Sequence, residues 1–483
     1  MMLRKAAMEE LQAVCNLYRA TCRGMEQSGL DQWHWGIYPD EAMVREDIAR
    51  GELYVAGGPD GLRCAVCVNR MFDEAYNGVN WLYGVHPGSF HRLAVHPSCQ
   101  GQGLGRQVLD CVVELLRSQG CDCLRMDTFT QNQRAQRLYE SFGMRRAGLV
   151  TFSFRPEPFV CFEKPLTEAC PLLPLRMHPA FRGGALTPWG GEKLRTVYGK
   201  PICDVPTGES LEVSCIPGLE STDDMGVKLP ELIARHGAAF AGKYAAQPFP
   251  LLLKLIDASE SLSVQVHPDD AYAHENENGK LGKTEAWLIL DAPEGSQLVY
   301  GIRPGTTLDS LRAACEAGEA VEPLLRRVDV HAGDVCFIPA GCVHAIGAGI
   351  MLYEIQQSSD VTYRFYDWNR VDSQGRRREL HLRKALDVTD LSFSLSPIPA
   401  PDVPCARVLD ETYFTLDLLR VDGRAVLPAI CDFGLLTALD GALTLQWAGG
   451  ALTLARGESV YIPTSAPALT LTGQGRAALS MPR

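Results

Sequence analysis

Four side chains in the middle of the sequence are of the types that bind a divalent metal. Gln265 and His267 are two residues apart in a segment that alternates apolar and polar residues, so on a β-strand both would leave the same face. Glu285 opens a second apolar segment, and His344 follows a Pro-Ala-Gly turn signal. Two imidazoles, a carboxylate and an amide oxygen suit zinc when a further position stays open for water or substrate. We therefore predict a catalytic metal site.

The pattern alone leaves other interpretations open. A histidine in a strand, taken singly, also fits a hydrogen-bonded core residue. No spacing rule like that of a four-cysteine zinc site joins the four positions. Two histidines and a carboxylate could also hold Fe(II) in an oxygenase.

A glycine-rich turn near the start of the chain suggests a second chemistry. Residues 100–105 read QGQGLG and lie between a strand ending near Val95 and an amphipathic helix. Glycines there let backbone N–H groups approach an anion, and the helix N-terminus favours its charge, so a pyrophosphate would fit. The alternative that this turn is only a tight connection, with no ligand, stays open. Dinucleotide binding is an alternative function for this turn. The glycine motif of a dinucleotide-binding unit, however, should follow the first strand of that unit, and several elements precede this turn.

Two regions of different pattern must position these groups. Up to about residue 165 helical and strand patterns alternate, which predicts an α/β unit. Beyond a stretch rich in Pro and Gly most segments are strands, and from Cys405 onward short strands recur as in a sandwich or barrel. The expected helices are 9–23, 104–118, 133–142, 229–236, 307–317 and 321–326. The expected strands of the first region are 53–56, 62–71, 92–95, 123–128 and 159–164.

From about Pro171 to Arg483 the sequence resembles the short class I mannose-6-phosphate isomerases, which are cupin-fold zinc enzymes. The matching segments, in order, are PWGGEKLRTVYGK, the Q-x-H at 265–267, GKTEAW, FIPAGCVHAI and YEIQQSSDVTYRFYDWNR. The resemblance implies Zn²⁺ as the metal. The ligands it implies are Gln265, His267, Glu285 and His344.

The same resemblance implies interconversion of mannose 6-phosphate and fructose 6-phosphate. This reaction moves a hydrogen between adjacent carbons while a charged enediolate is stabilised, and a divalent ion that polarises the sugar oxygens supplies several kcal/mol. Ser263, Lys283 and Arg364 match family positions that face the substrate, and arginine suits bidentate contact with phosphate. Glu354 is a candidate for proton transfer or substrate positioning, Lys283 is another candidate for proton transfer, and the sequence does not choose between them.

Roughly the first 165 residues resemble the GNAT-family N-acetyltransferases through HRLAVHPSCQGQGLGRQVLDCVVELL and LRMDTFTQNQRAQRLYESFGMRRAG. The resemblance implies acetyl-CoA as cofactor. The residues it places against the cofactor phosphates and pantetheine arm are Gln100, Gly101, Gly103, Gly105 and Asn132. Tyr139 would protonate the departing thiolate as a general acid. The sequence does not identify the acceptor amine. Asp73 and Glu74 are only guesses for the base that deprotonates it.

Composition restricts the partners. The 483 residues are 46% apolar and 22% charged, with a net charge of -12 that argues against a general nucleic-acid or anionic-membrane partner. The start lacks the uncharged apolar core of a signal peptide, and no 18 apolar residues run together, so we expect a soluble, cytoplasmic protein. The 17 cysteines are scattered and are expected to be reduced, buried thiols.

We therefore predict a multidomain chain. The expected parts are an α/β domain of GNAT fold (1–168), a linker (169–187), a mostly-β cupin or jelly-roll isomerase domain with a small helical insertion (188–400), and a degenerate second cupin-like barrel (401–483). The expected function is a zinc-dependent isomerase fused to an acetyl-CoA-dependent N-acetyltransferase, acting on a hexose 6-phosphate and an unknown amine. A non-catalytic cupin that senses sugar phosphates is the alternative, and the intact Lys283, Glu354 and Arg364 favour the enzyme.

Overall fold

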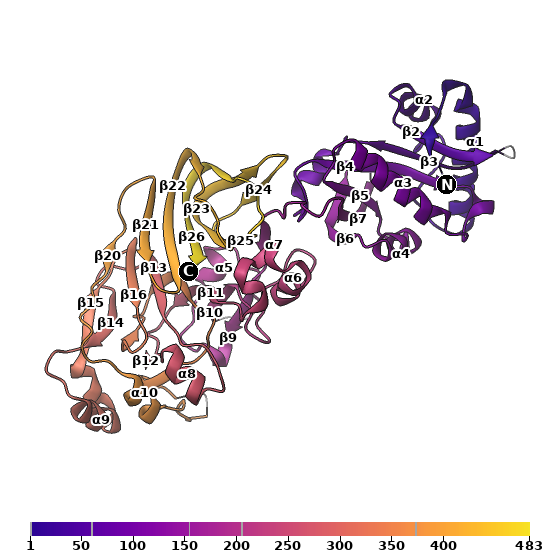
Figure 1. The fold of residues 1–483 in the computed structure, drawn as a ribbon. Coiled ribbons are helices and arrows are strands. Elements are labelled where there is room, and N and C mark those ends of the chain that lie inside the picture. The colour runs from indigo at the N-terminus through magenta and orange to yellow at the C-terminus, as the bar shows by residue number, and fades with distance from the viewer. Residues whose placement is uncertain (1, 59–60, 154, 204–205, 372–373) are drawn as a thin grey trace. The chain divides into compact units, whose positions relative to one another are not determined.

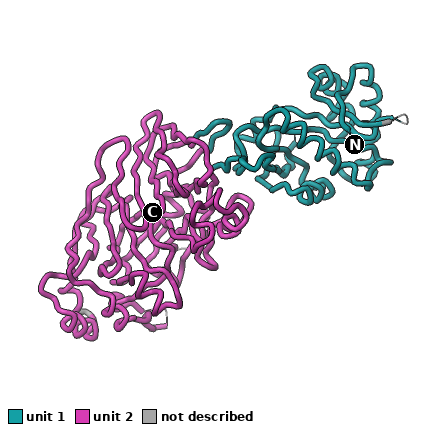
Figure 2. The backbone as a smooth tube through the Cα atoms, viewed as in Figure 1, with its two compact units in different colours: residues 1–173, 446–452 teal, residues 174–445, 453–483 magenta. Residues whose placement is uncertain are grey.

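The computed structural model describes residues 2–58, 61–153, 155–203, 206–371 and 374–483 (Figure 1). The chain forms two compact units (Figure 2). Unit 1 comprises Met1–Leu173 with Gln446–Leu452, and unit 2 comprises Pro174–Leu445 with Thr453–Arg483. No helix in the described ranges combines the length and the apolar character needed to cross a bilayer.

Unit 1 is built on a seven-stranded sheet in the order β1-β2-β3-β4-β5-β7-β6. Its strands are β1 (Arg4–Lys5), β2 (Leu53–Gly58), β3 (Gly61–Asn69), β4 (Pro87–Val95), β5 (Cys123–Phe129), β6 (Arg145–Phe152) and β7 (Arg155–Pro165). Its helices are α1 (Leu11–Gln27), α2 (Glu41–Ala49), α3 (Leu104–Ser118) and α4 (Gln133–Ser141). Short 3₁₀ turns lie at η1 (Met8–Glu10), η2 (Glu74–Gly78) and η3 (Pro97–Cys99).

The alternation of side chains along the strands explains why helices cover both faces of this sheet. On β2, Leu53 and Val55 point into a core closed by α1 and α2. Tyr54 and Ala56, in the alternate positions, point into a second core closed by α3 and α4. Both faces are therefore buried.

The sheet opens between β4 and β5. These two strands pair in parallel, with Pro87 opposite Cys123 and Gly88 opposite Leu124. Their pairing in the described structure ends there, although β4 continues to Val95 and β5 to Phe129. The two strands therefore diverge toward their carboxyl ends.

Three further sheets have all or most of their described residues in unit 2. The first, in the order β20-β16-β13-β18-β11-β10-β9, contains β9 (Ala180–Gly183), β10 (Thr207–Val213), β11 (Leu251–Ala258), β13 (Glu285–Asp291), β16 (Asp334–Ile338), β18 (Ile350–Gln357) and β20 (Ile398–Pro399). The second, in the order β15-β14-β17-β12-β19, contains β12 (Val264–Val266), β14 (Gln297–Ile302), β15 (Leu325–Asp329), β17 (His344–Ala345) and β19 (Tyr363–Tyr366).

The third sheet is formed by the carboxyl-terminal part of the chain together with β8. Its strands are β8 (Leu175–Met177), β21 (Cys405–Asp410), β22 (Phe414–Val426), β23 (Gly434–Trp447), β24 (Gly450–Leu454), β25 (Ser459–Ile462) and β26 (Thr470–Pro482). The helices of unit 2 are α5 (Lys193–Thr196), α6 (Leu229–His236), α7 (Ala238–Ala241), α8 (Asp270–Asn276), α9 (Leu308–Glu316) and α10 (Leu382–Val388).

The first and second sheets of unit 2 face each other across an apolar core. Trp287 and Leu352 come to this core from the first sheet, and Leu298 and Tyr300 come from the second. The opposite face of the second sheet is covered by α9 and α10 (Figure 1). A two-sheet sandwich of this kind can present polar side chains from both sheets to one interior site.

Most expected elements are confirmed. The helices at 104–118, 133–142, 229–236 and 307–317 correspond to α3, α4, α6 and α9. The helix expected at 321–326 was wrong in its second half, because a 3₁₀ helix, η6 (Gly318–Leu324), ends there and β15 begins at Leu325. Pro323 lacks the backbone N–H that an α-helix would need. The sequence did not predict the helices α2, α5, α7, α8 and α10 or the strands β1 and β6 of unit 1.

Candidate active sites

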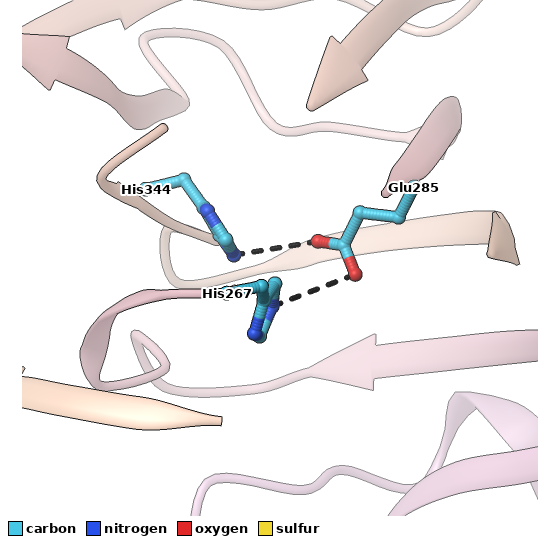
Figure 3. Close-up of side chains that lie close together, drawn as sticks. All are labelled: His267, Glu285 and His344. Carbon is cyan, nitrogen blue, oxygen red and sulfur yellow. Dashed lines mark ion pairs between the residues drawn. The ribbon is translucent and has the colours of Figure 1, made fainter. Parts of the chain in front are cut away.

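His267, Glu285 and His344 meet inside the sandwich (Figure 3). One ligand atom from each lies within 4.8 Å of the others. His344 Nε2 is 3.3 Å from Glu285 Oε1, and His267 Nε2 is 3.7 Å from Glu285 Oε2. All three side chains are no more than 1% exposed.

Strand pairing brings Gln265 to the same place. Gln265 of β12 lies opposite His344 of β17, and its Nε2 is 3.3 Å from His344 Nε2. Val264 and Val266, in the alternate positions of β12, point into the core beneath α9 and α10. The structure thus brings together all four side chains that the sequence predicts as ligands.

Hydrogen bonds orient the two imidazoles. His267 Nδ1 lies 2.9 Å from the carbonyl oxygen of Val361, and His344 Nδ1 lies 2.9 Å from that of Cys342. Since a carbonyl only accepts, each Nδ1 carries the proton and each Nε2 presents a lone pair to the site. Burial lowers the pKa of His344 to about 3 and holds that of His267 well below its usual value. Both rings are therefore neutral at pH 7, as metal ligands must be.

The carboxylate of Glu285 fits the same role. Both of its oxygens are buried, and neither accepts a hydrogen bond of good geometry from the described residues, although the Lys283 ammonium lies 2.8 Å from Oε2. A buried polar atom without such a partner is costly unless something else satisfies it. Two neutral imidazole nitrogens beside this carboxylate suit a divalent cation such as zinc.

Three predicted substrate-facing residues lie on or next to the strands that carry this cluster. Lys283 Nζ lies 3.1 Å from His267 Nε2 and 2.8 Å from Glu285 Oε2. Ser263 is buried immediately before β12, and Arg364 of β19 lies opposite Gln265. The guanidinium of Arg364 makes no ion pair with a carboxylate of the described residues, and burial lowers its pKa. Arg364 is thus available to an anionic group.

Glu354 is held in place by a lysine that the sequence reading missed. In register across three strands lie Lys254 of β11, Glu354 of β18 and Trp287 of β13. Lys254 Nζ is 3.1 Å from Glu354 Oε1, and Trp287 Nε1 donates to Glu354 Oε2 at 3.0 Å. Lys254 also lies 3.3 Å from Glu209 Oε1. A lysine inside the apolar segment LLLKLIDA was the available signal.

A second candidate site is a cavity of about 1020 Å³ in unit 1. Its lining includes the predicted Gln100, Gly101, Gly103, Gly105, Asn132 and Tyr139. Gly101 and Gly103 have φ of +78° and +75°, and Gly103 directly precedes α3. A Cβ built on either would meet no atom within 4 Å, so this loop borders open space at a helix N-terminus. Such a loop fits an anionic phosphate group.

The polar residues of this cavity are partly engaged already. Gln100 Oε1 accepts a hydrogen bond from Arg134 at 2.6 Å, and Asn132 Oδ1 accepts one from the Ala135 N–H at 3.0 Å, which caps α4. Burial raises the pKa of the Tyr139 phenol, so it stays protonated at neutral pH, as a general acid requires.

Asp73 and Glu74, the two residues suggested as the base that deprotonates the acceptor, differ in their relation to the cavity. Asp73 lines it, whereas Glu74 is not among its lining residues. The lining includes a further carboxylate, Asp127 of β5, which the sequence reading missed. A charged residue in the otherwise apolar segment LRMDTF was its signal.

Two facing sheets with an inward cluster of histidine, glutamate and glutamine side chains define a metal-binding sandwich of the cupin type. The model of the phosphomannose isomerase type I catalytic domain matches residues 206–287, and that of the mannose-6-phosphate isomerase cupin domain matches residues 406–482. A mannose-6-phosphate isomerase from Streptococcus mutans is 36% identical over 57% of this chain and 89% of its own length. The chain therefore belongs to the mannose-6-phosphate isomerase family.

A solved structure gives the same result for the fold. The mannose 6-phosphate isomerase from Bacillus subtilis is 32% identical and aligns with a TM-score of 0.57 over 64% of this chain and 99% of that one. This confirms the expected mostly-β cupin-type region.

A second family model matches part of the amino-terminal unit. The model of the acetyltransferase (GNAT) family matches residues 30–144. A mycothiol acetyltransferase from Beutenbergia cavernae is 39% identical over 56 residues, which cover 12% of this chain and 19% of that protein. The predicted fusion of a GNAT acetyltransferase domain with an isomerase is confirmed at the level of the two families.

Proposed function

We propose that unit 2 interconverts mannose 6-phosphate and fructose 6-phosphate with a bound zinc ion. The observation that carries the proposal is the buried cluster of His267, Glu285 and His344, whose donor atoms face one another with both imidazoles neutral. With Gln265, these residues would hold the ion, which supplies polarisation of the sugar oxygens where negative charge develops.

The chain's own residues divide the remaining work. Arg364, half-buried and without a carboxylate partner in the described ranges, is proposed to bind the phosphate together with Ser263. Lys283 is the better placed group for proton transfer, because its ammonium lies against two of the donor atoms. Glu354 is proposed to position the substrate, since Lys254 and Trp287 already hold its carboxylate.

We also propose that unit 1 transfers an acetyl group from acetyl-CoA to an amine. In this proposal Gln100, Gly101, Gly103 and Gly105 bind the cofactor phosphates, Asn132 lies near its pantetheine arm, and Tyr139 protonates the leaving thiolate. The functional domains would be 1–168 for the acetyltransferase, 188–400 for isomerase catalysis and 401–483 for a supporting cupin-like domain, with a linker at 169–187. A cytoplasmic location fits the 17 cysteines, which are expected to be reduced thiols.

The test of the isomerase is turnover of mannose 6-phosphate by the full chain before chelation, after chelation and after zinc is returned. We expect turnover to vanish with the chelator and to return with zinc. His267→Ala should lower kcat/KM at least about 100-fold, because several kcal/mol of charge stabilisation depend on the bound ion. Zinc content, measured by mass spectrometry, should fall in the same variant.

The matched control is His331→Ala, since His331 has a side chain that is 81% exposed. It should keep both turnover and zinc. A folded, zinc-loaded chain that binds mannose 6-phosphate without turning it over would instead support a non-catalytic sensor and overturn the isomerase proposal.

A further inference from the structure

The cavity of unit 1 contains a carboxylate for which neither family membership nor the proposed cofactor contacts give a role. Asp127 lies on β5, on the stretch that diverges from β4. Its Oδ2 accepts a hydrogen bond from the hydroxyl of Tyr76 at 2.6 Å. Its Oδ1 receives none from the described residues, and no described lysine, arginine or histidine forms an ion pair with it. The carboxylate thus faces the cavity with one oxygen unused.

The surroundings of Asp127 raise its pKa toward neutral pH. Burial raises the pKa of Asp127 to about 6, while the hydrogen bond from Tyr76 opposes that rise and the charge of Asp73 adds to it. The ionisable groups that interact electrostatically with Asp127 are Tyr38 before α2, Asp73 and Tyr76 at η2, Tyr139 of α4 and Cys161 of β7. None of these groups is a cation. Asp127 is therefore ionised at pH 7 but basic enough to take a proton.

Two arginines of the cavity lining are already paired with carboxylates. Arg155 is 2.9 Å from Asp31 and 3.1 Å from Glu157, and Arg92 is 2.6 Å from Asp47. His91 has a pKa lowered by burial to about 4 and is neutral at pH 7. An anionic acceptor would find these arginines occupied, whereas a cationic one would find the carboxylate of Asp127.

Aromatic rings also line the cavity. The lining includes Trp33, Tyr38, Tyr76, Phe152 and Phe159. Aromatic faces attract an ammonium group and pack against an apolar body. The aromatic walls and the carboxylate together favour an amine whose only charge is its ammonium.

We propose that Asp127 receives the ammonium group of a primary amine with an apolar or aromatic body and accepts its proton, held in place by Tyr76. This rests on the proposed acetyltransferase activity of unit 1. The ammonium gives one proton to Asp127, and the neutral nitrogen attacks the thioester carbon. The C–S bond then breaks, the thiolate takes the proton of Tyr139, and the second proton leaving nitrogen restores the phenol. The products are an amide, the CoA thiol and one proton released to water.

The experiment measures thiol release by the full chain from acetyl-CoA with 2-phenylethylamine, hexylamine or glucosamine 6-phosphate as acceptor, from pH 5 to 9. We expect the two apolar amines to be acetylated and kcat/KM to rise through about pH 6. Asp127→Asn should lower kcat/KM at least about 100-fold and remove that rise. It should also weaken calorimetric binding of 2-phenylethylamine to the CoA-loaded protein about tenfold, while acetyl-CoA affinity stays unchanged. Asp110→Asn, an exposed position on α3, is the matched control.

Tyr76→Phe tests the role of the hydroxyl without removing the base. Because the hydrogen bond from Tyr76 lowers the pKa of Asp127, its loss should move the rise of kcat/KM to higher pH. Tyr76 is thus a positioning residue, and a merely structural role would leave the pH profile in place.

The possible failures are distinguishable. A wild-type chain that binds no acetyl-CoA would overturn the acetyltransferase proposal itself. A chain that binds acetyl-CoA but acetylates only glucosamine 6-phosphate, or none of the amines, would overturn the acceptor class. Asp127→Asn with wild-type kcat/KM would overturn the role of Asp127.

Discussion

Lys254 supplies the positive charge between two buried carboxylates, Glu209 and Glu354. Lys254→Met removes that charge and leaves both carboxylates without it. Breaking a buried ion pair by removing one partner costs about 3–5 kcal/mol, so we expect the free energy of unfolding of unit 2 to fall by about that amount. Hydrogen exchange with mass spectrometry in denaturant reads unit 2 peptides separately.

The control for this residue is Lys280→Met. Lys280 pairs with Asp360 at 2.7 Å, but the two side chains are 51% and 39% exposed. An exposed pair contributes about 0–1 kcal/mol, so this variant should be nearly neutral. Equal effects of the two substitutions would contradict a stabilising role for Lys254.

The ionised carboxylate of Asp127 should lower the free energy of unfolding of unit 1 at neutral pH. Its folded pKa of about 6 lies above the ordinary value of 3.8, so its favourable contribution is present below pH 3.8 and is lost as pH rises through 6. The difference between these two pKa values corresponds to at most about 3 kcal/mol. We expect Asp127→Asn to raise the free energy of unfolding of unit 1 at pH 7, with a gain that shrinks toward pH 4. A gain independent of pH, in hydrogen exchange of unit 1 peptides, would contradict this.

At the scale of elements, the turn before α3 can be tested with a pair of glycines. Gly103 and Gly120 both have φ of +75°, and a Cβ on either would meet no atom within 4 Å. Alanine at either position should therefore cost about 1–2 kcal/mol from backbone strain alone. Gly103→Ala should in addition weaken acetyl-CoA binding at least about tenfold in calorimetry, since Gly103 lines the cavity. Comparable affinities for the two variants would argue against phosphate binding by this turn.

The elements also show what the sequence could and could not predict. The helix at 104–118 was predictable because its apolar residues recur with helical period after a glycine-rich start. The ligand residues were predictable from a resemblance and from the parity of β12. Their convergence was not predictable from pattern, because it depends on which strands become neighbours: Gln265 pairs with His344, 79 residues away. Lys254 and Asp127 were overlooked because a charge inside an apolar strand gives no clue to the partner that stabilises it.

For the whole molecule, each proposed site draws its residues from one unit. The metal cluster and its neighbours lie in unit 2, and the cavity residues discussed above lie in unit 1. We expect His267→Ala to abolish isomerisation while leaving acetyl-CoA affinity within about twofold. Gly103→Ala should weaken acetyl-CoA binding and leave isomerisation unchanged. Parallel assays of both activities on both variants check this, and a variant that loses both would contradict it.

The divergence of β4 from β5 has a consequence beyond catalysis. Beyond Gly88 and Leu124 the facing edges of these strands are not paired with each other in the described structure, which makes them an internal version of an exposed sheet edge. Such edges attract any extended chain that carries amide groups, and this is why proteins usually shield them from self-association. A bound molecule with amide groups along an extended arm would act as the missing strand. It would shield these backbone groups as a neighbouring strand does.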